Sequence, residues 1–192
     1  TTEGTLSITP VEDEVVVTVT GNSDLKSYKY DGAAHTVEGY TTQISNALYT
    51  EADITFTGTA TVTGTDAGTY PMGLVQANFT NNSDNFANVR FNVTDGSLVI
   101  AKRNVTLTSA TDSKVYDGTA LTNANVTVGG DGFATGEGAT YAVTGEVTNV
   151  AEGTVTNTFT YTLDANTKAD NYDITTTEGT LSITPVEDEV VV

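Results

Sequence analysis

The sequence predicts a mostly β protein built from two small β-rich modules in tandem, and three observations lead to this fold class. Thr supplies 40 of the 192 residues, and β-branched side chains fit the pleated surface of a sheet. Apolar and polar residues alternate with a period of two in short runs, which Gly, Asn or Asp usually bounds. The chain also repeats itself at two scales, which indicates tandem modules.

The longer repeat joins the two ends of the chain. Residues 1–17 read TTEGTLSITPVEDEVVV, and residues 176–192 read the same, so the sequence returns after 175 positions. An identity of this length indicates one full period of a near-identical array that runs on into a next copy. We therefore expect the chain to be part of a longer tandem-repeat protein.

A shorter, divergent repeat lies inside this period. Lys29-Tyr30-Asp31-Gly32 returns 86 positions later as Val115-Tyr116-Asp117-Gly118, and Asn85-Phe86 returns as Asn171-Tyr172 at the same offset. Two homologous modules explain these matches. The predicted domains are the tail of a preceding repeat at 1–10, module A at 11–101, module B at 102–185 and the start of a next repeat at 186–192.

Strand signals occur in the same order in both modules. In module A they cover 15–20, 35–40, 53–63, 68–71, 89–93 and 97–101. In module B they cover 104–109, 125–128, 140–147, 156–163, 172–175 and 180–184. The segments 43–51 and 73–79 offer one or two helical turns at most, because neither combines a cap with a full apolar stripe.

The junctions between modules differ in composition. Pro185 and the acidic run 187–189 follow module B, and a proline cannot join a central ladder. Residues 100–105 join A to B without Gly or Pro, and strand signal continues almost unbroken through them. A link this short predicts a limited range of angles. We therefore expect the modules to be arranged end to end as a rod.

Charge and cysteine content exclude several classes of function. The 25 acidic and 7 basic residues give a net charge of −18, which argues against binding to nucleic acid or to anionic membrane surfaces. No stretch has the length of a membrane span, so we expect no membrane insertion. The absence of Cys excludes disulfides, thiol catalysis and thiolate metal sites.

The candidate site residues are the two Tyr-Asp-Gly turns, Tyr30, Asp31, Gly32 and Tyr116, Asp117, Gly118. An aromatic ring beside an Asp could contact a carbohydrate. The simpler interpretation is a strand that ends in a tight turn, in which Gly supplies a positive φ and Asp bonds nearby backbone. Because the motif recurs at equivalent places in both modules, we interpret both turns as structural.

Other residues suggest chemistry only weakly. His35 is the only histidine, so it can form neither a zinc site without Cys nor a triad without a nucleophile motif. Residues 129–138 resemble a phosphate loop, but a β-like run follows where a helix is needed, so we expect a flexible hairpin loop. The acidic run 187–189, copied at 12–14, is the best calcium candidate, and a solvated linker is its simpler interpretation. Lys–Asn isopeptide crosslinks would need one of Lys26, Lys29, Lys102, Lys114 and Lys168.

Four sequence runs resemble the YDG/MBG-type tandem repeat modules of bacterial (Gram-positive) cell-surface adhesins, which are related to mucus-binding protein repeats. These runs are YKYDGAAHTVEGY at 28–40, GTDAGTYPMGL at 64–74, DGSLVIAKR at 95–103 and SKVYDGTALTN at 113–123. The resemblance covers both modules, and its specificity lies in the order and spacing of short motifs. It implies small β-rich modules that are β-grasp-like, with an Ig-like sandwich as the alternative, in an extracellular, cell wall-attached protein. It supplies no catalytic or ligand-binding residues.

From these observations we expect no enzyme, with no catalytic, cofactor-binding or metal residues and no cofactor. The leading function is a structural stalk repeat that projects a distal binding region from the cell wall. Its partners are then the neighbouring repeats of the same chain. The alternative is a repeat that itself binds host glycan, mucin or immunoglobulin, in which repetition supplies avidity.

Identical sequences at the two ends are expected to occupy different surroundings. Residues 180–184 should close module B as an ordered and buried strand, whereas the identical residues 5–9 belong to an earlier module. We expect residues 5–9 to be loosely attached or paired with another molecule, because an unpaired strand recruits a neighbour. Val15–Val17 should be paired inside module A, while their copies at 190–192 begin a next module.

Overall fold

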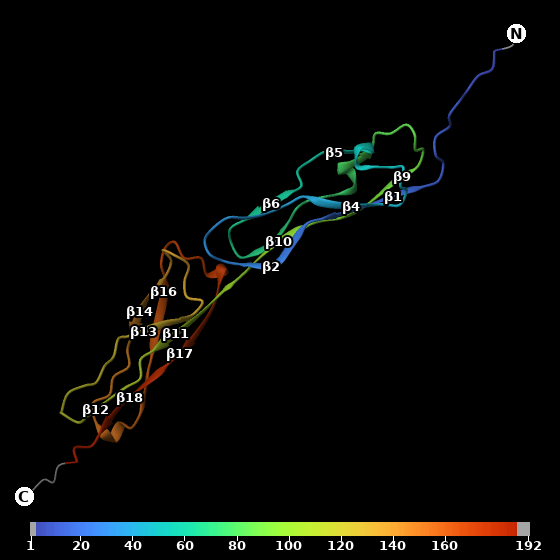
Figure 1. The fold of residues 1–192 in the computed structure, drawn as a ribbon. Coiled ribbons are helices and arrows are strands. Elements are labelled where there is room, and N and C mark those ends of the chain that lie inside the picture. Colours follow the sequence, from blue (N-terminus) through green and yellow to red (C-terminus); the bar gives the residue numbers. More distant parts are fainter. Residues whose placement is uncertain (1–2, 188–192) are drawn as a thin grey trace, which may run out of the picture. The chain divides into compact units, whose positions relative to one another are not determined.

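A computed structural model describes residues 3–187, apart from the side chains of Lys26 and Ser27. The chain divides into two compact units (Figure 1). Unit 1 contains Thr1–Tyr28 and Ala33–Ile100, and unit 2 contains Lys29–Gly32 and Ala101–Val192. The short segment Lys29–Gly32, which we had assigned to module A, therefore packs with the residues of module B.

Unit 1 contains two three-stranded sheets and two strand pairs. The first sheet has the order β4 (Tyr40–Ile44), β1 (Val15–Gly21), β9 (Val89–Thr94). The second has the order β2 (Ser23–Lys29), β10 (Ser97–Ala101), β7 (Gly68–Pro71). The strand pairs are β3 (His35–Glu38) with β6 (Thr61–Gly64) and β5 (Ile54–Phe56) with β8 (Phe79–Asn81). Two 3₁₀ turns, Glu51–Asp53 and Gln76–Asn78, precede β5 and β8.

The core of unit 1 follows from the alternation in β1. Val15, Val17 and Val19 are fully buried, while the residues between them lie half-buried on the other face. The other buried apolar residues of unit 1 include Phe79, Phe86, Phe91, Leu98 and Ile100. Burial of these side chains from water is the main stabilising term for a unit of this size.

Unit 2 repeats this plan. Its first sheet has the order β13 (Val126–Gly130), β11 (Arg103–Ser109), β17 (Tyr172–Thr177). Its second sheet has the order β12 (Asp112–Val115), β18 (Gly179–Thr184), β15 (Val155–Asn157). A hairpin-like pair joins β14 (Ala139–Val143) to β16 (Phe159–Leu163), and 3₁₀ turns cover Val150–Glu152 and Ala169–Asn171.

Equivalent strands pair with the same direction in the two units. In each first sheet the first strand lies antiparallel to one neighbour and parallel to the other, as β1 does to β4 and β9 and β11 does to β13 and β17. In each second sheet the last strand lies antiparallel to a strand from the middle of the unit, as β10 does to β7 and β18 does to β15. The internal repeat seen in the sequence is therefore a repeat of strand topology.

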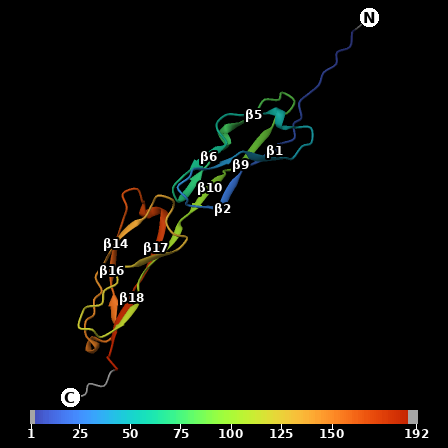
Figure 2. The same cartoon turned by 60° about the vertical axis from the view of Figure 1, so that its left-hand side comes forward.

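The first and last segments of unit 2 run side by side in the same direction. β11 pairs with β17 from Arg103↔Tyr172 to Thr108↔Thr177, and β12 pairs with β18 from Asp112↔Leu181 to Val115↔Thr184, both in parallel. Figure 2 shows β17 and β18 following one another along the unit. Because parallel strands start at the same end, the chain comes into unit 2 at one end and leaves it at the other.

Most of the predicted strands are confirmed, and the differences have physical reasons. The segments 68–71 and 97–101 coincide with β7 and β10, but 53–63 and 156–163 each contain two strands, which pair with different neighbours. Strands β2, β4, β8 and β12 were missed because they lack a run of alternating apolar residues. Residues 43–51 contain the end of β4, a turn and the first residue of a 3₁₀ turn, and 73–79 contains one 3₁₀ turn.

Two finer expectations are corrected by the topology. Residues 129–138 do not form a hairpin loop, because β13 pairs with β11 whereas β14 pairs with β16. An Ig-type sandwich is built from antiparallel sheets, so the parallel pairs β1–β9 and β11–β17 distinguish these units from it. The only helical elements within residues 3–187 are four 3₁₀ turns, which leaves no helix to cover a sheet as in a β-grasp.

The identical ends differ as expected. In β18, Leu181 is fully buried and Ile183 is 5% exposed, whereas their copies Leu6 and Ile8 are fully exposed and lie outside any strand. The prediction for residues 5–9 and 180–184 is confirmed in this respect. Val15–Val17 pair inside unit 1, also as predicted. Their copies at 190–192, with most of the start of the next repeat (188–192), lie outside the described residues.

Candidate functional site

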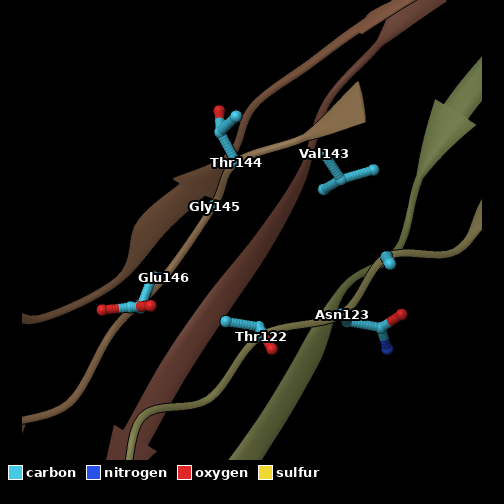
Figure 3. A pocket seen from close by; sticks show the side chains of 7 residues that line it. Thr122, Asn123, Val143, Thr144, Gly145 and Glu146 are labelled. Carbon is cyan, nitrogen blue, oxygen red and sulfur yellow. The ribbon is translucent and has the colours of Figure 1, made fainter. Parts of the chain in front are cut away.

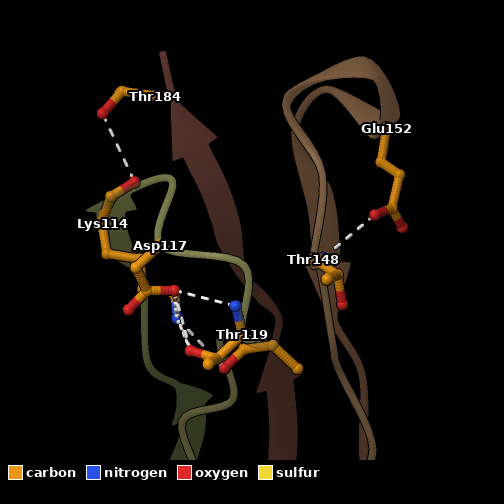
Figure 4. Close-up of polar contacts among 7 residues, drawn as sticks. Lys114, Asp117, Thr119, Thr148, Glu152 and Thr184 are labelled. Atoms are coloured by element: carbon orange, nitrogen blue, oxygen red, sulfur yellow. Dashed lines mark hydrogen bonds and ion pairs between the residues drawn. The ribbon is translucent and has the colours of Figure 1, made fainter. Parts of the chain in front are cut away.

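The turn at Tyr116, Asp117 and Gly118 is built around one carboxylate (Figure 4). Asp117 Oδ1 accepts hydrogen bonds from the backbone amide of Thr119 at 2.9 Å and from its hydroxyl at 2.8 Å. Lys114 Nζ lies 2.8 Å from the same oxygen. Gly118 has φ 78°, a conformation that favours glycine. Every one of these contacts is local, so the motif closes a turn.

The charge of Asp117 is stabilised by this network. The hydrogen bond from Lys114 and the two from Thr119 hold the pKa of the carboxyl well below its usual range. Lys114 is itself held in place, since its ammonium also contacts the Thr119 hydroxyl at 2.6 Å. A group kept ionised in this way cannot act as a general acid near neutral pH. The carboxylate is therefore suited to hold the turn.

We expect Asp117→Asn to lower the stability of unit 2 at neutral pH. The folded pKa of Asp117 is depressed, so its contribution is present above the ordinary carboxyl pKa of about 4 and is lost as the pH falls through the folded pKa. The difference in midpoint denaturant concentration between the two proteins should be largest near pH 7 and shrink below pH ~4. Urea unfolding followed by circular dichroism at several pH values measures this.

Asp173→Asn serves as the control for this prediction. Asp173 pairs with Lys102 at 3.6 Å, and both side chains are about half exposed or more. Exposed pairs of this kind contribute little, so the variant should unfold like the parent chain. A stability difference for Asp117→Asn that stayed constant between pH 7 and pH 3 would contradict the role assigned to its charge.

The equivalent Tyr30 has very different surroundings, although its motif is the same. It is only 4% exposed and belongs to unit 2, where its ring meets Tyr172 edge-on with centroids 5.5 Å apart. Its hydroxyl donates to Glu137 Oε1, and the Tyr172 hydroxyl donates to Glu137 Oε2 at 2.7 Å. One carboxylate thus joins two buried phenols. Phe133 packs edge-on against Tyr172 with ring centroids 5.2 Å apart. We call Phe133, Glu137 and Tyr172 the tyrosine socket of unit 2.

Charged groups fix the chain on either side of Tyr30. Arg103 donates to the Tyr30 carbonyl at 3.2 Å and to the Asp131 carbonyl at 2.8 Å. Lys29 Nζ lies 2.8 Å from the Asp131 carboxylate. Asp31 and Gly32 are exposed, and Gly32 has φ 81°. The site therefore clamps the backbone before and at Tyr30 while leaving the turn itself at the surface.

The socket is suited to packing and not to proton transfer. Burial is the main reason why the pKa of Tyr172 rises to about 12, and the adjacent Glu137 carboxylate raises it further. The phenol consequently stays protonated and acts as a donor at physiological pH. The Tyr172 oxygen also accepts from the Ala134 amide at 3.0 Å, so its hydrogen-bonding capacity is used inside the unit. No group in this arrangement is prepared to attack a substrate.

The other sequence-predicted candidates lie apart from the socket. His35 lies in β3 and stacks on Tyr28, with ring centroids 4.0 Å apart. Glu14 pairs with Arg90 at 3.1 Å, and the residues that the structure describes contain no group of three His, Asp or Glu placed to hold a metal. Asp188 and Glu189 lie outside those residues, as does the Lys26 side chain. Lys29, Lys102 and Lys114 each pair with an aspartate.

A pocket in unit 2 is lined by a mixture of polar and apolar residues (Figure 3). Its lining comprises Thr122, Asn123, Ala124, Val143, Thr144, Gly145 and Glu146. Glu146 is the only ionisable residue among them, so the pocket offers no acid–base pair. Asn157 is fully buried, and its oxygen lies close to the pocket residue Gly145. Its amide nitrogen donates to the carbonyls of Ala110 and Asn123. These bonds tie neighbouring chain segments together.

Sequence reasoning placed the two turns but missed the socket. Phe133 and Glu137 lie in the glycine-rich segment 129–138, which we had interpreted only as a loop. The sequence identifies Tyr172 as a marker of the internal repeat, but it does not reveal that Tyr172 packs against Tyr30. The sequence contains one hint of the socket. The glycine-rich segment 129–138 carries an aromatic residue, Phe133, and a charged residue, Glu137, which a purely flexible loop would not need. Contacts between residues this distant in the chain leave no local pattern.

Comparison of the chain with protein-family models, with curated protein sequences and with solved structures finds no match. Within residues 3–187, none of the helical elements has the length and apolar character needed to cross a membrane.

Proposed function

We propose that the chain is a structural repeat in the stalk of a long bacterial surface adhesin, attached to the cell wall and projecting a distal binding region. The observation that carries this proposal is the path of the chain through unit 2. Its first and last strand segments run in parallel, from Arg103↔Tyr172 at one end to Val115↔Thr184 at the other. A unit that is traversed in this way adds its own length to a chain of repeats.

Antiparallel first and last strands would have the opposite effect, because both ends of the unit would then lie together. About 12 residues of paired strand at ~3.3 Å each give unit 2 a length of about 40 Å along its strands. Near-identical repetition, as between 1–17 and 176–192, suits a function in which length matters more than any single site. The resemblance of four runs to adhesin repeat modules supports an extracellular location.

Small-angle scattering from chains of one, two and three 175-residue periods tests the stalk. We expect the units to lie end to end as a rod, so that the radius of gyration exceeds about 16 Å for one period and rises almost in proportion to the number of periods. A compact arrangement would instead rise only as about the 0.38 power of chain length. That weaker dependence would contradict the proposal.

A binding function has one observation in its favour. Tyr141 and Tyr161 lie opposite each other on β14 and β16, and Tyr161 is 37% exposed, so the pair offers aromatic surface to a sugar ring. If the repeat binds host glycan or mucin, Tyr161→Ala should abolish binding on a glycan array or mucin surface while leaving unfolding unchanged. Failure of the parent chain to bind on these surfaces would leave the stalk as the function.

A further inference from the structure

Unit 1 contains a pocket of about 200 Å³ beside β4, the edge strand of its first sheet. Tyr40, Thr42, Glu51 and Ile54 line this pocket. Thr42 lies opposite the buried Val19 of β1, and Tyr40 stands two residues away on the same face of β4. Two side chains that carry hydroxyls therefore occupy the core-facing side of this strand, where the core reaches the edge of the sheet.

These two residues differ from their counterparts in unit 2. β4 lies antiparallel to β1 as β13 lies antiparallel to β11. At the 86-residue offset of the internal repeat, Tyr40 and Thr42 correspond to Val126 and Val128 of β13. Because valine occupies both positions in the same topology, the fold itself does not require a phenol and a hydroxyl here. Their presence in unit 1 points to a ligand.

The hydrogen-bonding capacity of the pocket is only partly used. The Thr42 hydroxyl donates to Glu51 Oε1. Among residues 3–187, the Tyr40 hydroxyl and Glu51 Oε2 have no hydrogen-bond partner. Burial raises the pKa of Tyr40, and the charge of Glu51 raises it further, so the phenol stays protonated at neutral pH. The pocket thus offers a donor, the phenol, close to an acceptor, the carboxylate.

A donor beside an acceptor matches the hydroxyl groups of a sugar. A hydroxyl both donates and accepts, so two neighbouring hydroxyls of one ring can bind the phenol and the carboxylate together, whereas an ammonium group only donates. Ile54 and the Tyr40 ring, both half-buried, supply an apolar wall for the CH groups of the ring. The carboxylate and the net charge of −18 both disfavour an anionic sugar.

We propose that this pocket of unit 1 binds a single neutral sugar residue, with Tyr40 donating to one ring hydroxyl and Glu51 accepting from its neighbour. The site is separate from the Tyr141–Tyr161 pair, which lies on β14 and β16 of unit 2. It is also independent of the stalk, because a repeat adds length to an array whether or not it binds a sugar.

Nuclear magnetic resonance titration of the full chain tests this site. The probes are the methyl glycosides of glucose, galactose, mannose, fucose, N-acetylglucosamine and N-acetylgalactosamine, with sialic acid as the anionic comparison. We expect at least one neutral glycoside to bind in the millimolar range and to shift the resonances of the Tyr40 ring and the Ile54 methyl groups. Absence of binding by all of these glycosides, or stronger binding of sialic acid, would overturn the proposal.

Conservative variants assign the binding to these side chains. Tyr40→Phe and Glu51→Gln keep the size of each side chain, and each should weaken binding by about tenfold because it removes one hydrogen-bonding partner of the sugar. Glu38→Gln, which changes an exposed carboxylate of β3, and Tyr161→Phe in unit 2 should bind like the parent chain. Urea unfolding checks that all four variants are folded.

Each remaining outcome separates the two proposals. Binding that persists in both Tyr40→Phe and Glu51→Gln would contradict the assignment, as would binding that is lost only in Tyr161→Phe. A rod in the scattering experiment that binds none of the sugars keeps the stalk and excludes this site. Sugar binding by a compact array, lost in Tyr40→Phe, would keep the site and contradict the stalk.

Discussion

Leu181→Ala is expected to destabilise unit 2 by about 3 kcal/mol, whereas Leu6→Ala should leave the chain unchanged within about 0.5 kcal/mol. The two leucines occupy identical sequence, TTEGTLSITP, at its two occurrences. Leu181 is fully buried in a cluster with Val147 and Ile183, and removal of its side chain leaves a cavity. Leu6 is fully exposed, so its truncation removes no packing.

Urea unfolding monitored by circular dichroism measures both variants. Any difference between them has to come from tertiary surroundings, because local propensity is the same at both positions. Ile183→Ala with Ile8→Ala repeats the comparison two residues further along, at 5% and 97% exposure. An equal loss of stability for Leu6→Ala and Leu181→Ala would show that residues 3–10 pack against the chain.

Gly179→Ala is expected to destabilise unit 2 by more than about 2 kcal/mol or to prevent its folding. A Cβ at this position would lie 2.4 Å from the Ala110 carbonyl oxygen and 2.5 Å from the Ser109 carbonyl oxygen. Both neighbours are backbone atoms, Ser109 at the end of β11 and Ala110 just after it, and the Gly179 amide also donates to Ser109 Oγ at 2.9 Å. Relief of the clash would therefore separate the parallel segments.

Gly4→Ala is the control, since Gly4 is the sequence copy of Gly179 and has nothing within 4 Å of its Cβ position. This variant should unfold like the parent chain. The same close approach occurs in unit 1 between Gly21 and Gly96, where a Cβ on Gly96 would lie 2.2 Å from the Asn22 carbonyl oxygen. If Gly179→Ala folded with parental stability, the two strand segments could not approach as closely as described.

The strands that the sequence predicted best are those in which the alternation of apolar residues matches the observed alternation of burial. Residues 97–101, SLVIA, alternate between buried and half-buried positions, and the predicted segment coincides with β10. By contrast β2, SDLKSYK, carries charged and polar residues with a single Leu, and it forms because it lies beside β10. Its conformation depends on a tertiary neighbour, which no local pattern reports.

At the candidate site, too, the local sequence does not report which residues become neighbours in the fold. Gly32 and Gly118, the glycines of the repeated Tyr-Asp-Gly motif, both have the positive φ that the interpretation as turns requires. The motif could not reveal that Tyr30 is buried against Tyr172 while Tyr116 is exposed, because burial depends on which residues lie beside each ring. Glu137 is the clearest omission, since its two hydrogen-bonded tyrosines lie far from it in the sequence.

The chain comes into unit 2 at one end and leaves it at the other, and the distance between Lys102 and Thr184 measures this directly. The chain contains no Cys, so Lys102→Cys with Thr184→Cys allows two spin labels to be attached at defined positions. Double electron–electron resonance should give a separation of about 35–40 Å, because parallel segments with ~3.3 Å per residue separate the two ends of the unit. A separation of about 15 Å or less, as antiparallel first and last segments would produce, would contradict the account.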